Sequence, residues 1–134
     1  MAEYIRTTSI AVPVGSAVTY TDTIKKGCCN IRHRAGSGLI TVKGGSCCNP
    51  NTYRITFHGN VRGVQGAMVL GIYLDGELLP ETRMSVFGTG TTPVYSVDAT
   101  TEILVSGCCA NISVRVIEGA LTVDTAAIIV DKEN

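Results

Sequence analysis

The stretch that decides the fold is Thr52–Gly76, TYRITFHGNVRGVQGAMVLGIYLDG. In its first half Tyr53, Ile55 and Phe57 alternate with polar residues, and this period of two puts apolar side chains on one face of a β-strand. The second half, Ala67–Leu74, is apolar on both faces and ends in Asp-Gly, a strong signal for a tight turn. An antiparallel strand normally buries one face only. The second apolar face therefore predicts a further contact, most simply with another subunit.

Short β-runs recur along the whole chain, separated by turn residues. The expected strands are Tyr4–Val12, Ala17–Ile24, Asn30–Arg34, Leu39–Lys43, Thr52–Asn60, Ala67–Leu74, Arg83–Phe87, Val94–Val97, Glu102–Val105, Asn111–Ile117 and Val123–Val130. No window keeps the 3.6-residue apolar period of a helix. This spacing predicts one all-β domain over residues 1–134, an antiparallel two-sheet jelly-roll sandwich of about ten strands. The first strand, residues 4–12, could alternatively extend outward and dock on a partner, because chain termini are free to reach out.

Charge and hydropathy exclude several classes of function. The chain has 134 residues, 11 basic and 11 acidic, with a formal net charge of +0. A neutral surface disfavours nucleic acid and anionic membranes as partners. No run reaches the length of a membrane span, and no signal peptide is evident, so we expect synthesis in the host cytoplasm.

No catalytic constellation is evident in the sequence. The carboxylates are dispersed, and His33 and His58 fall on separate predicted strands. Acid–base chemistry needs a matched pair of groups, and a transition-metal face needs more nitrogen or sulfur ligands at one place. We therefore expect a protein that is not an enzyme and that has no catalytic residues and no cofactor.

Three pairs of adjacent cysteines are the most unusual feature of the composition. The pairs are Cys28-Cys29, Cys47-Cys48 and Cys108-Cys109. On a strand, neighbouring side chains face opposite sides, so each pair could place one thiol inward and one outward. A hairpin of Asn30–Arg34 with Leu39–Lys43 would bring the first two pairs together. Free thiols, disulfides within or between subunits, and a metal site all remain open, although adjacent cysteines do not match the usual zinc-ligand spacing.

A second strand, Ala126–Val130, is also apolar on both faces. Together with Ala67–Leu74 it defines the predicted subunit interface. The residues of that interface are Met68, Val69, Leu70, Tyr73, Ala126, Ile128 and Val130. The alternative is that a loop of the same chain covers the outer side of the terminal strand.

Several segments, taken in order, resemble the core motifs of the jelly rolls of tumour necrosis factor (TNF) and of the complement globular head. They are GSGLITV (Gly36–Val42), TYRITFHGNV (Thr52–Val61), AMVLGIYLDGELLPET (Ala67–Thr82), VDATTEILVSGCCANISVRVIEG (Val97–Gly119) and LTVDTAAIIVDKE (Leu121–Glu133). Cys108-Cys109 stands where that family usually has Gly-Asp. The resemblance implies a ten-stranded jelly roll that assembles as a compact homotrimer about a three-fold axis.

The small size and the Thr-, Gly- and Val-rich sequence with paired cysteines look more like proteins of phages and prophages of Gram-positive bacteria. This resemblance implies a structural protein of the virion, either a capsid decoration or a head or tail fibre. Its partners would be itself, other capsid or tail proteins and a host-surface glycan. A bacterial surface or spore-coat trimer and a lectin-like ligand-binding module are the alternatives.

Overall fold

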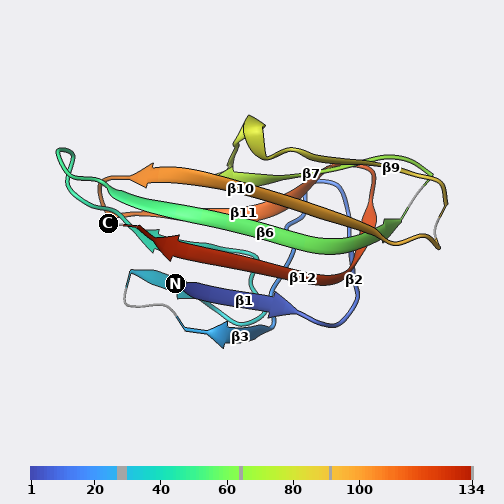
Figure 1. Ribbon diagram of the computed structural model, residues 1–134, viewed down its shortest axis with the longest axis horizontal. Coiled ribbons are helices and arrows are strands. Elements are labelled where there is room, and N and C mark those ends of the chain that lie inside the picture. Colours follow the sequence, from blue (N-terminus) through green and yellow to red (C-terminus); the bar gives the residue numbers. More distant parts are fainter. Residues whose placement is uncertain (27–29, 64, 91, 134) are drawn as a thin grey trace.

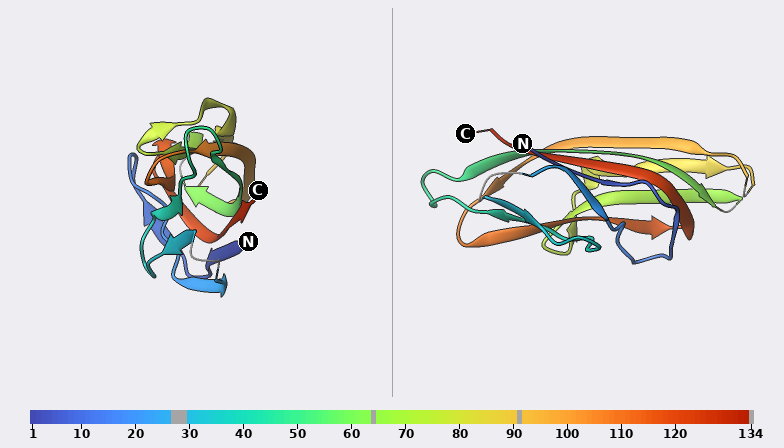
Figure 2. Two further views of the ribbon diagram at one scale, coloured as in Figure 1. Left: turned by 90° about the vertical axis from the view of Figure 1, so that its left-hand side faces the viewer. Right: turned by 90° about the horizontal axis from the view of Figure 1, so that it is seen from below.

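The computed structural model describes residues 1–26, 30–63, 65–90 and 92–133, which form two antiparallel β-sheets stacked face to face (Figures 1 and 2). The elements are β1 (Ala2–Arg6), β2 (Ile10–Val12), β3 (Asp22–Lys25), β4 (Ile31–His33), β5 (Ile40–Lys43), β6 (Asn51–Gly63), β7 (Gly66–Leu74), β8 (Glu77–Leu78), the 3-10 turn η1 (Pro80–Thr82), β9 (Met84–Gly88), β10 (Tyr95–Val105), β11 (Cys109–Glu118) and β12 (Leu121–Lys132). The predicted all-β jelly-roll sandwich is confirmed. Within these described ranges no helix is long and apolar enough to cross a membrane.

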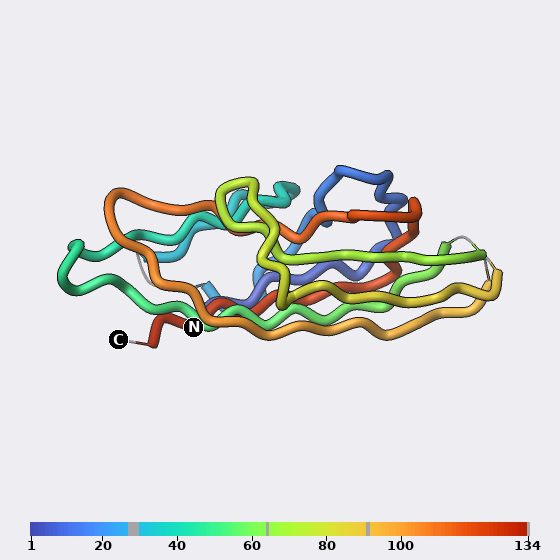
Figure 3. The backbone as a smooth tube through the Cα atoms, turned by 90° about the horizontal axis from the view of Figure 1, so that it is seen from above, coloured from blue at the N-terminus to red at the C-terminus, as the bar shows by residue number. Residues whose placement is uncertain are grey.

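The first sheet, which we call the β6 sheet, has the strand order β10-β6-β12-β1-β3, and β2 also pairs with β12. It faces the viewer in Figure 1. The second, which we call the β7 sheet, has the order β4-β5-β11-β7-β8, and β9 also pairs with β7. The chain passes from one sheet to the other between β6 and β7. The stretch Thr52–Gly76 therefore supplies a central strand to each layer (Figure 3).

The core lies between the two sheets and follows the predicted alternation. Tyr53, Ile55 and Phe57 of β6 are fully buried, while Arg54 and His58 between and beyond them are exposed. The inward side of β7 contributes to the same core with the fully buried residues Met68, Leu70 and Ile72. The apolar period of two thus places one face of each central strand in a shared core.

Two of the expected strands form a single one. Val94–Val97 and Glu102–Val105 were expected as separate strands, but β10 runs without a break from Tyr95 to Val105. The residues between them continue the alternation: Ala99 lies opposite Phe57, and Thr101 lies opposite Ile55. Local sequence favours a turn here, but pairing with the long strand β6 keeps the chain extended.

The two strands expected nearest the N-terminus also differ from the prediction. The expected strand Tyr4–Val12 divides into β1 and β2, and both pair with β12. Because β1 also pairs with β3, both of its hydrogen-bonding edges are used within the chain rather than for docking on a partner. Most of the expected strand Ala17–Ile24 is irregular: Ala17 forms an isolated bridge, and β3 starts only at Asp22.

Two predicted turns are confirmed. Asp75 and Gly76 both have positive φ, 52° and 85°, the geometry that lets a two-residue turn join β7 to β8. The predicted hairpin of β4 with β5 also forms, with Ile31 opposite Val42. These turns fix which side chains share a face on the β7 sheet.

Candidate functional site

The structure corrects most of the predicted subunit interface. Five of its seven residues belong to the chain's own buried core, namely Met68, Leu70, Ala126, Ile128 and Val130. Their exposed fractions range from 0% to 5%. Side chains that already fill the space between the two sheets cannot also form a contact with another subunit.

The other two predicted residues, Val69 and Tyr73, lie on the outer side of β7 and are covered by the same chain. A side chain at Gly71, between them, would meet the methyl ends of Leu78 and Ile117. Arg115 lies over the Tyr73 ring, with its Cζ atom 5.8 Å from the ring centroid. From Val69 to Tyr73 the outer side of β7 is therefore closed by β8 and β11, whereas Ala67 and the opposite residue Phe87 remain exposed at the start of the strand.

The outer face of the β6 sheet has a different character. No described element crosses this face in Figure 1. Its centre carries uncharged side chains from four adjacent strands, which we call the neutral band. The neutral band consists of Ile5, Thr56, Thr100, Ala127 and Ile129, in which Ile129 lies opposite Thr56, Thr56 opposite Thr100, and Ile5 opposite Ala127. Ala127 and Ile129 are the outward residues of the segment Ala126–Val130, and they lie on this open face.

Charged groups lie at the two ends of this face and satisfy one another. At one end Arg54 forms ion pairs with Glu102 at 3.6 Å and with Glu133 at 3.3 Å. At the other end Arg62 donates a 2.9 Å hydrogen bond from Nε to Oδ1 of Asp124. That bond is the main reason why the pKa of Asp124 lies below its usual range. Between these ends the neutral band is bordered by titratable groups, because Glu3 lies opposite Ile129, His58 opposite Ala127 and Asp98 opposite His58.

The structure also corrects the expected orientation of the cysteines. Cys47, Cys48, Cys108 and Cys109 are all exposed free thiols, so neither of these two pairs has one thiol in the core. The Sγ atoms of Cys47 and Cys48 are 3.8 Å apart, because this pair lies in a bend and not on a regular strand. Cys28 and Cys29 lie outside the described residues. Within the described ranges no three His, Cys, Asp or Glu side chains are placed to hold a metal ion.

Both described cysteine pairs lie at one end of the sandwich. The backbone N–H of Gly44 donates to the carbonyl oxygen of Cys108 at 3.2 Å. The N–H of Gly107 donates to the carbonyl oxygen of Gly45 at 2.9 Å. These bonds join the β5–β6 loop, which carries the first pair, to the β10–β11 turn, which carries the second.

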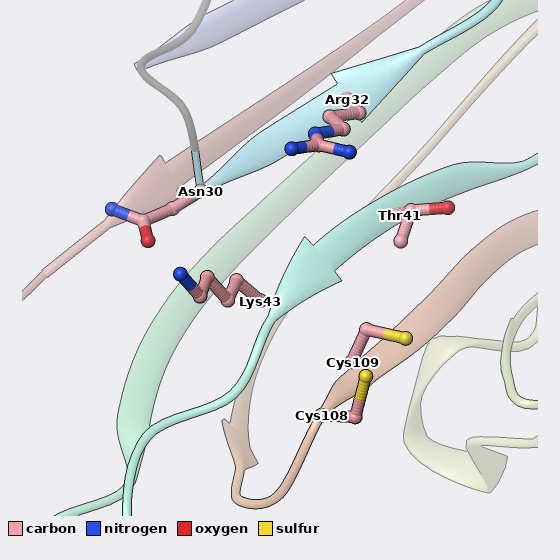
Figure 4. A pocket seen from close by; sticks show the side chains of 6 residues that line it. All are labelled: Asn30, Arg32, Thr41, Lys43, Cys108 and Cys109. Atoms are coloured by element: carbon pink, nitrogen blue, oxygen red, sulfur yellow. The ribbon is translucent and has the colours of Figure 1, made fainter.

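A hollow of about 230 Å³ opens beside Cys108 and Cys109 on the outer face of the β7 sheet (Figure 4). We call it the thiol pocket. The described residues that line it are Asn30, Arg32, Thr41, Lys43, Cys108 and Cys109. Pairing of β4, β5 and β11 brings them to one face, because Arg32 lies opposite Thr41 and Lys43 lies opposite Cys109. Sequence reasoning named the cysteines but did not foresee that two cations would join them.

Comparison with solved structures identifies the fold. The chain matches the globular domain of zebrafish complement 1qA with a TM-score of 0.66 and 11% identity, over 96% of this chain and 94% of that one. It matches murine APRIL with a TM-score of 0.64 and 12% identity, over 97% and 98%. It matches the Eiger TNF of S. frugiperda with a TM-score of 0.67 and 9% identity, over 99% and 94%. The fold is the TNF/C1q jelly roll.

The resemblance read from the sequence motifs is thus confirmed for the fold, and over nearly the whole chain. No protein-family model and no curated protein matches the sequence. These structural matches are too low in sequence identity to carry function with them. None of the three structures named above is a virion protein, and the phage part of the expectation stays a proposal.

The predicted subunit interface does not include the neutral band, although two residues of the band lie in the same segment as predicted interface residues. The segment Ala126–Val130 has two alternating sets of side chains, and the predicted interface contains the set Ala126, Ile128 and Val130. The structure puts that set in the core and leaves Ala127 and Ile129 on the outer face. The alternation along the strand separates the side chains into two sets, but only the position of the second sheet decides which set faces inward.

Proposed function

We propose that this chain is a non-enzymatic structural protein that assembles as a homotrimer through the outer face of the β6 sheet. The observation that carries the proposal is the neutral band, a cluster of uncharged side chains on an open sheet face, with Glu3, His58 and Asp98 beside it. Burial of apolar surface drives most protein association at about 25 cal/mol per Å². Interface centres hold few charged residues, and the ion pairs of Arg54 and Arg62 lie at the ends of this face, away from the neutral band.

The trimer itself is supported by the resemblance to the TNF and complement heads, which implies a three-fold axis. A closed three-fold ring joins two different patches of each subunit. The neutral band provides one patch. The edge strand β10 provides the other, since its Leu104 is 68% exposed and lies on the same outer face. Apolar contact between β10 of one subunit and the neutral band of the next would bury both.

Native mass spectrometry and light scattering at micromolar concentration test the assembly. The wild-type chain is expected to be a trimer, and Ile129→Asp is expected to be a folded monomer, because it places an unpaired charge in the contact. The matched control is Phe87→Asp, which changes a 72% exposed aromatic residue on the β7 sheet and should leave the trimer intact. A monomeric wild type, or a trimeric Ile129→Asp variant, would refute the proposed interface.

We further propose that the trimer is a component of a bacteriophage virion, a capsid decoration or a head or tail fibre, and that it is located there after synthesis in the host cytoplasm. What supports this finer proposal is the resemblance of the small Thr- and Gly-rich sequence to phage and prophage proteins. Mass spectrometry of purified particles from an induced host tests it. Recovery of the chain with cell-surface or spore material, and not with particles, would favour a bacterial surface or spore-coat trimer instead.

A further inference from the structure

The thiol pocket has two positively charged side chains in its lining, Arg32 and Lys43. Arg32 and Lys43 are exposed, and neither side chain has a hydrogen-bond or ion-pair partner among the described residues. Elsewhere Arg54 and Arg62 each bind a carboxylate. No described residue that lines the pocket is acidic. Two like charges on adjacent strands repel each other, and an anion between them would remove that repulsion.

Cys109 and Cys108 form the other wall of the pocket. A hydrogen bond with Cys108, followed by the electrostatic effect of that same thiol, raises the pKa of Cys109. Asp75 adds to this effect, and its Oδ1 atom already accepts the backbone N–H of Asn111 at 2.8 Å. A raised pKa favours the neutral thiol of Cys109, which does not repel an anion as a thiolate would. The aliphatic stems of the two cations and the thiols give the pocket an apolar lining beneath its charges.

The shape limits what can fit. A water molecule occupies about 30 Å³ of the liquid, and drug-sized ligands need pockets of about 300 Å³ or more. The volume of about 230 Å³ lies between these limits. It exceeds the need of a bare oxyanion and admits a small attached group. A guanidinium binds an oxyanion through two parallel hydrogen bonds, and an ammonium adds a point charge.

We propose that the thiol pocket binds an oxyanion, a phosphate or sulfate ester on an organic group of about monosaccharide size. Arg32 would hold two of the anion's oxygens and Lys43 a third, while the thiols and side-chain stems contact the attached group. The pocket lies on the β7 sheet, opposite the sheet proposed for assembly, so it stays open in the trimer. Binding and assembly can therefore fail independently.

Calorimetric titration at low ionic strength tests the proposal with glucose 6-phosphate, glucose 6-sulfate, inorganic phosphate and glucose. We expect saturable binding of at least one of the two esters, with inorganic phosphate weaker and glucose without effect. The phosphate and sulfate arms distinguish the two sources of the anion. If neither ester binds saturably at millimolar concentration, or if glucose binds equally well, the proposal is wrong.

Variants locate the site. Arg32→Gln and Lys43→Gln should each weaken binding about tenfold to a hundredfold, because each removes a charge-assisted contact. Arg83→Gln is the matched control, since Arg83 is exposed and lies outside the pocket. Equal weakening by all three variants would mean nonspecific attraction to positive charge and would overturn the assignment.

A second pair of variants tests the role of the thiols without removing a cation. Cys109→Ser keeps the size and neutrality of the wall and should retain binding within a few-fold. Cys109→Asp introduces a carboxylate beside Lys43 and should abolish it. Both changes are at an exposed position, so circular dichroism should show unchanged folding. Unaltered binding by Cys109→Asp would place the anion elsewhere.

Discussion

β7 and β12 have the same signature in the sequence, apolar residues on both faces, but the fold uses their outer faces differently. On β7 the outer side is closed within the chain, where Leu78 and Ile117 fill the space left by Gly71. On β12 the outer side, with Ala127 and Ile129, remains part of an open sheet face. A strand with two apolar faces is thus not by itself a sign of an interface. What decides is whether neighbouring strands offer side chains long enough to cover it.

The largest effect is expected when the same charge is placed on each of the two faces of β12 in turn. Ile128 is fully buried, so Ile128→Asp puts an unpaired carboxylate in the core and should cost about 4 kcal/mol or more. That is a large part of the stability of an ordinary domain, about 5–15 kcal/mol. Thermal and urea unfolding should show Ile128→Asp largely unfolded and Ile129→Asp folded. If the two variants lose the same stability, the inner and outer faces of β12 do not differ as we infer.

The closing of β7 depends on how the segment of residues 77–88 is held against its edge. β9 pairs with Gly66–Leu70 and β8 with Tyr73 and Leu74, which leaves Ile72 between them. Thr82 at the end of η1 fills this gap: its buried Oγ1 accepts the N–H of Ile72 at 2.9 Å. The Leu79 N–H donates to the carbonyl oxygen of Ile72 at 2.9 Å.

Thr82→Val is therefore expected to destabilise the monomer by about 2 kcal/mol, because it leaves a buried N–H without an acceptor. Urea unfolding measures the loss, and Thr82→Ser is the control that keeps the hydroxyl. The trimer should be unaffected in conditions where the variant is folded. An equal loss for the serine variant would mean that the methyl group, and not the hydrogen bond, holds the segment.

A feature of this fold could be predicted from the sequence when the residues that determine it lie close together along the chain. The buried set on β6 followed from alternation, and the turn at Asp75-Gly76 from its dipeptide, since both signals lie within a few residues. The role of Gly71 did not follow, because Leu78 and Ile117 reach it from different strands. The continuity of β10 and the choice of the inward set on β12 likewise depend on pairing with distant segments.

The candidate sites could be predicted only in part for the same reason. The cysteine pairs were evident in the sequence, but their common outward orientation required knowledge that Cys47-Cys48 lies in a bend. Arg32 was visible as part of a short basic run, yet nothing local connects it with Lys43 and Cys109. Only the order β4-β5-β11 brings these three side chains to one pocket.

A smaller effect tests how tightly β7 is covered. Gly71→Ala adds a methyl group that meets Leu78 and comes within 3.1 Å of Cδ1 of Ile117. Because the ends of both side chains can shift, the expected cost is about 1 kcal/mol. The double variant Gly71→Ala/Leu78→Ala should recover part of it, as measured by the shift of the urea midpoint. If Gly71→Ala is neutral and the double variant is worse, the outer side of β7 is less closely covered than we infer.

The smallest effect belongs to the charged end of the β12 face. The hydrogen bond from Arg62 lowers the pKa of Asp124 in the folded chain below its ordinary value of 3.8. A depressed folded pKa adds stability above the unfolded pKa and loses it as the pH falls through the folded value. Asp124→Asn should therefore leave the acid limb of the stability curve slightly flatter below about pH 4 and slightly lower stability at neutral pH. Solvent screening keeps the change small, because the pair is at the surface.

Unfolding midpoints measured between acid and neutral pH, with and without added salt, test this prediction. A neutral-pH loss of the same size in high salt would contradict this explanation, because salt screens the attraction between Asp124 and Arg62.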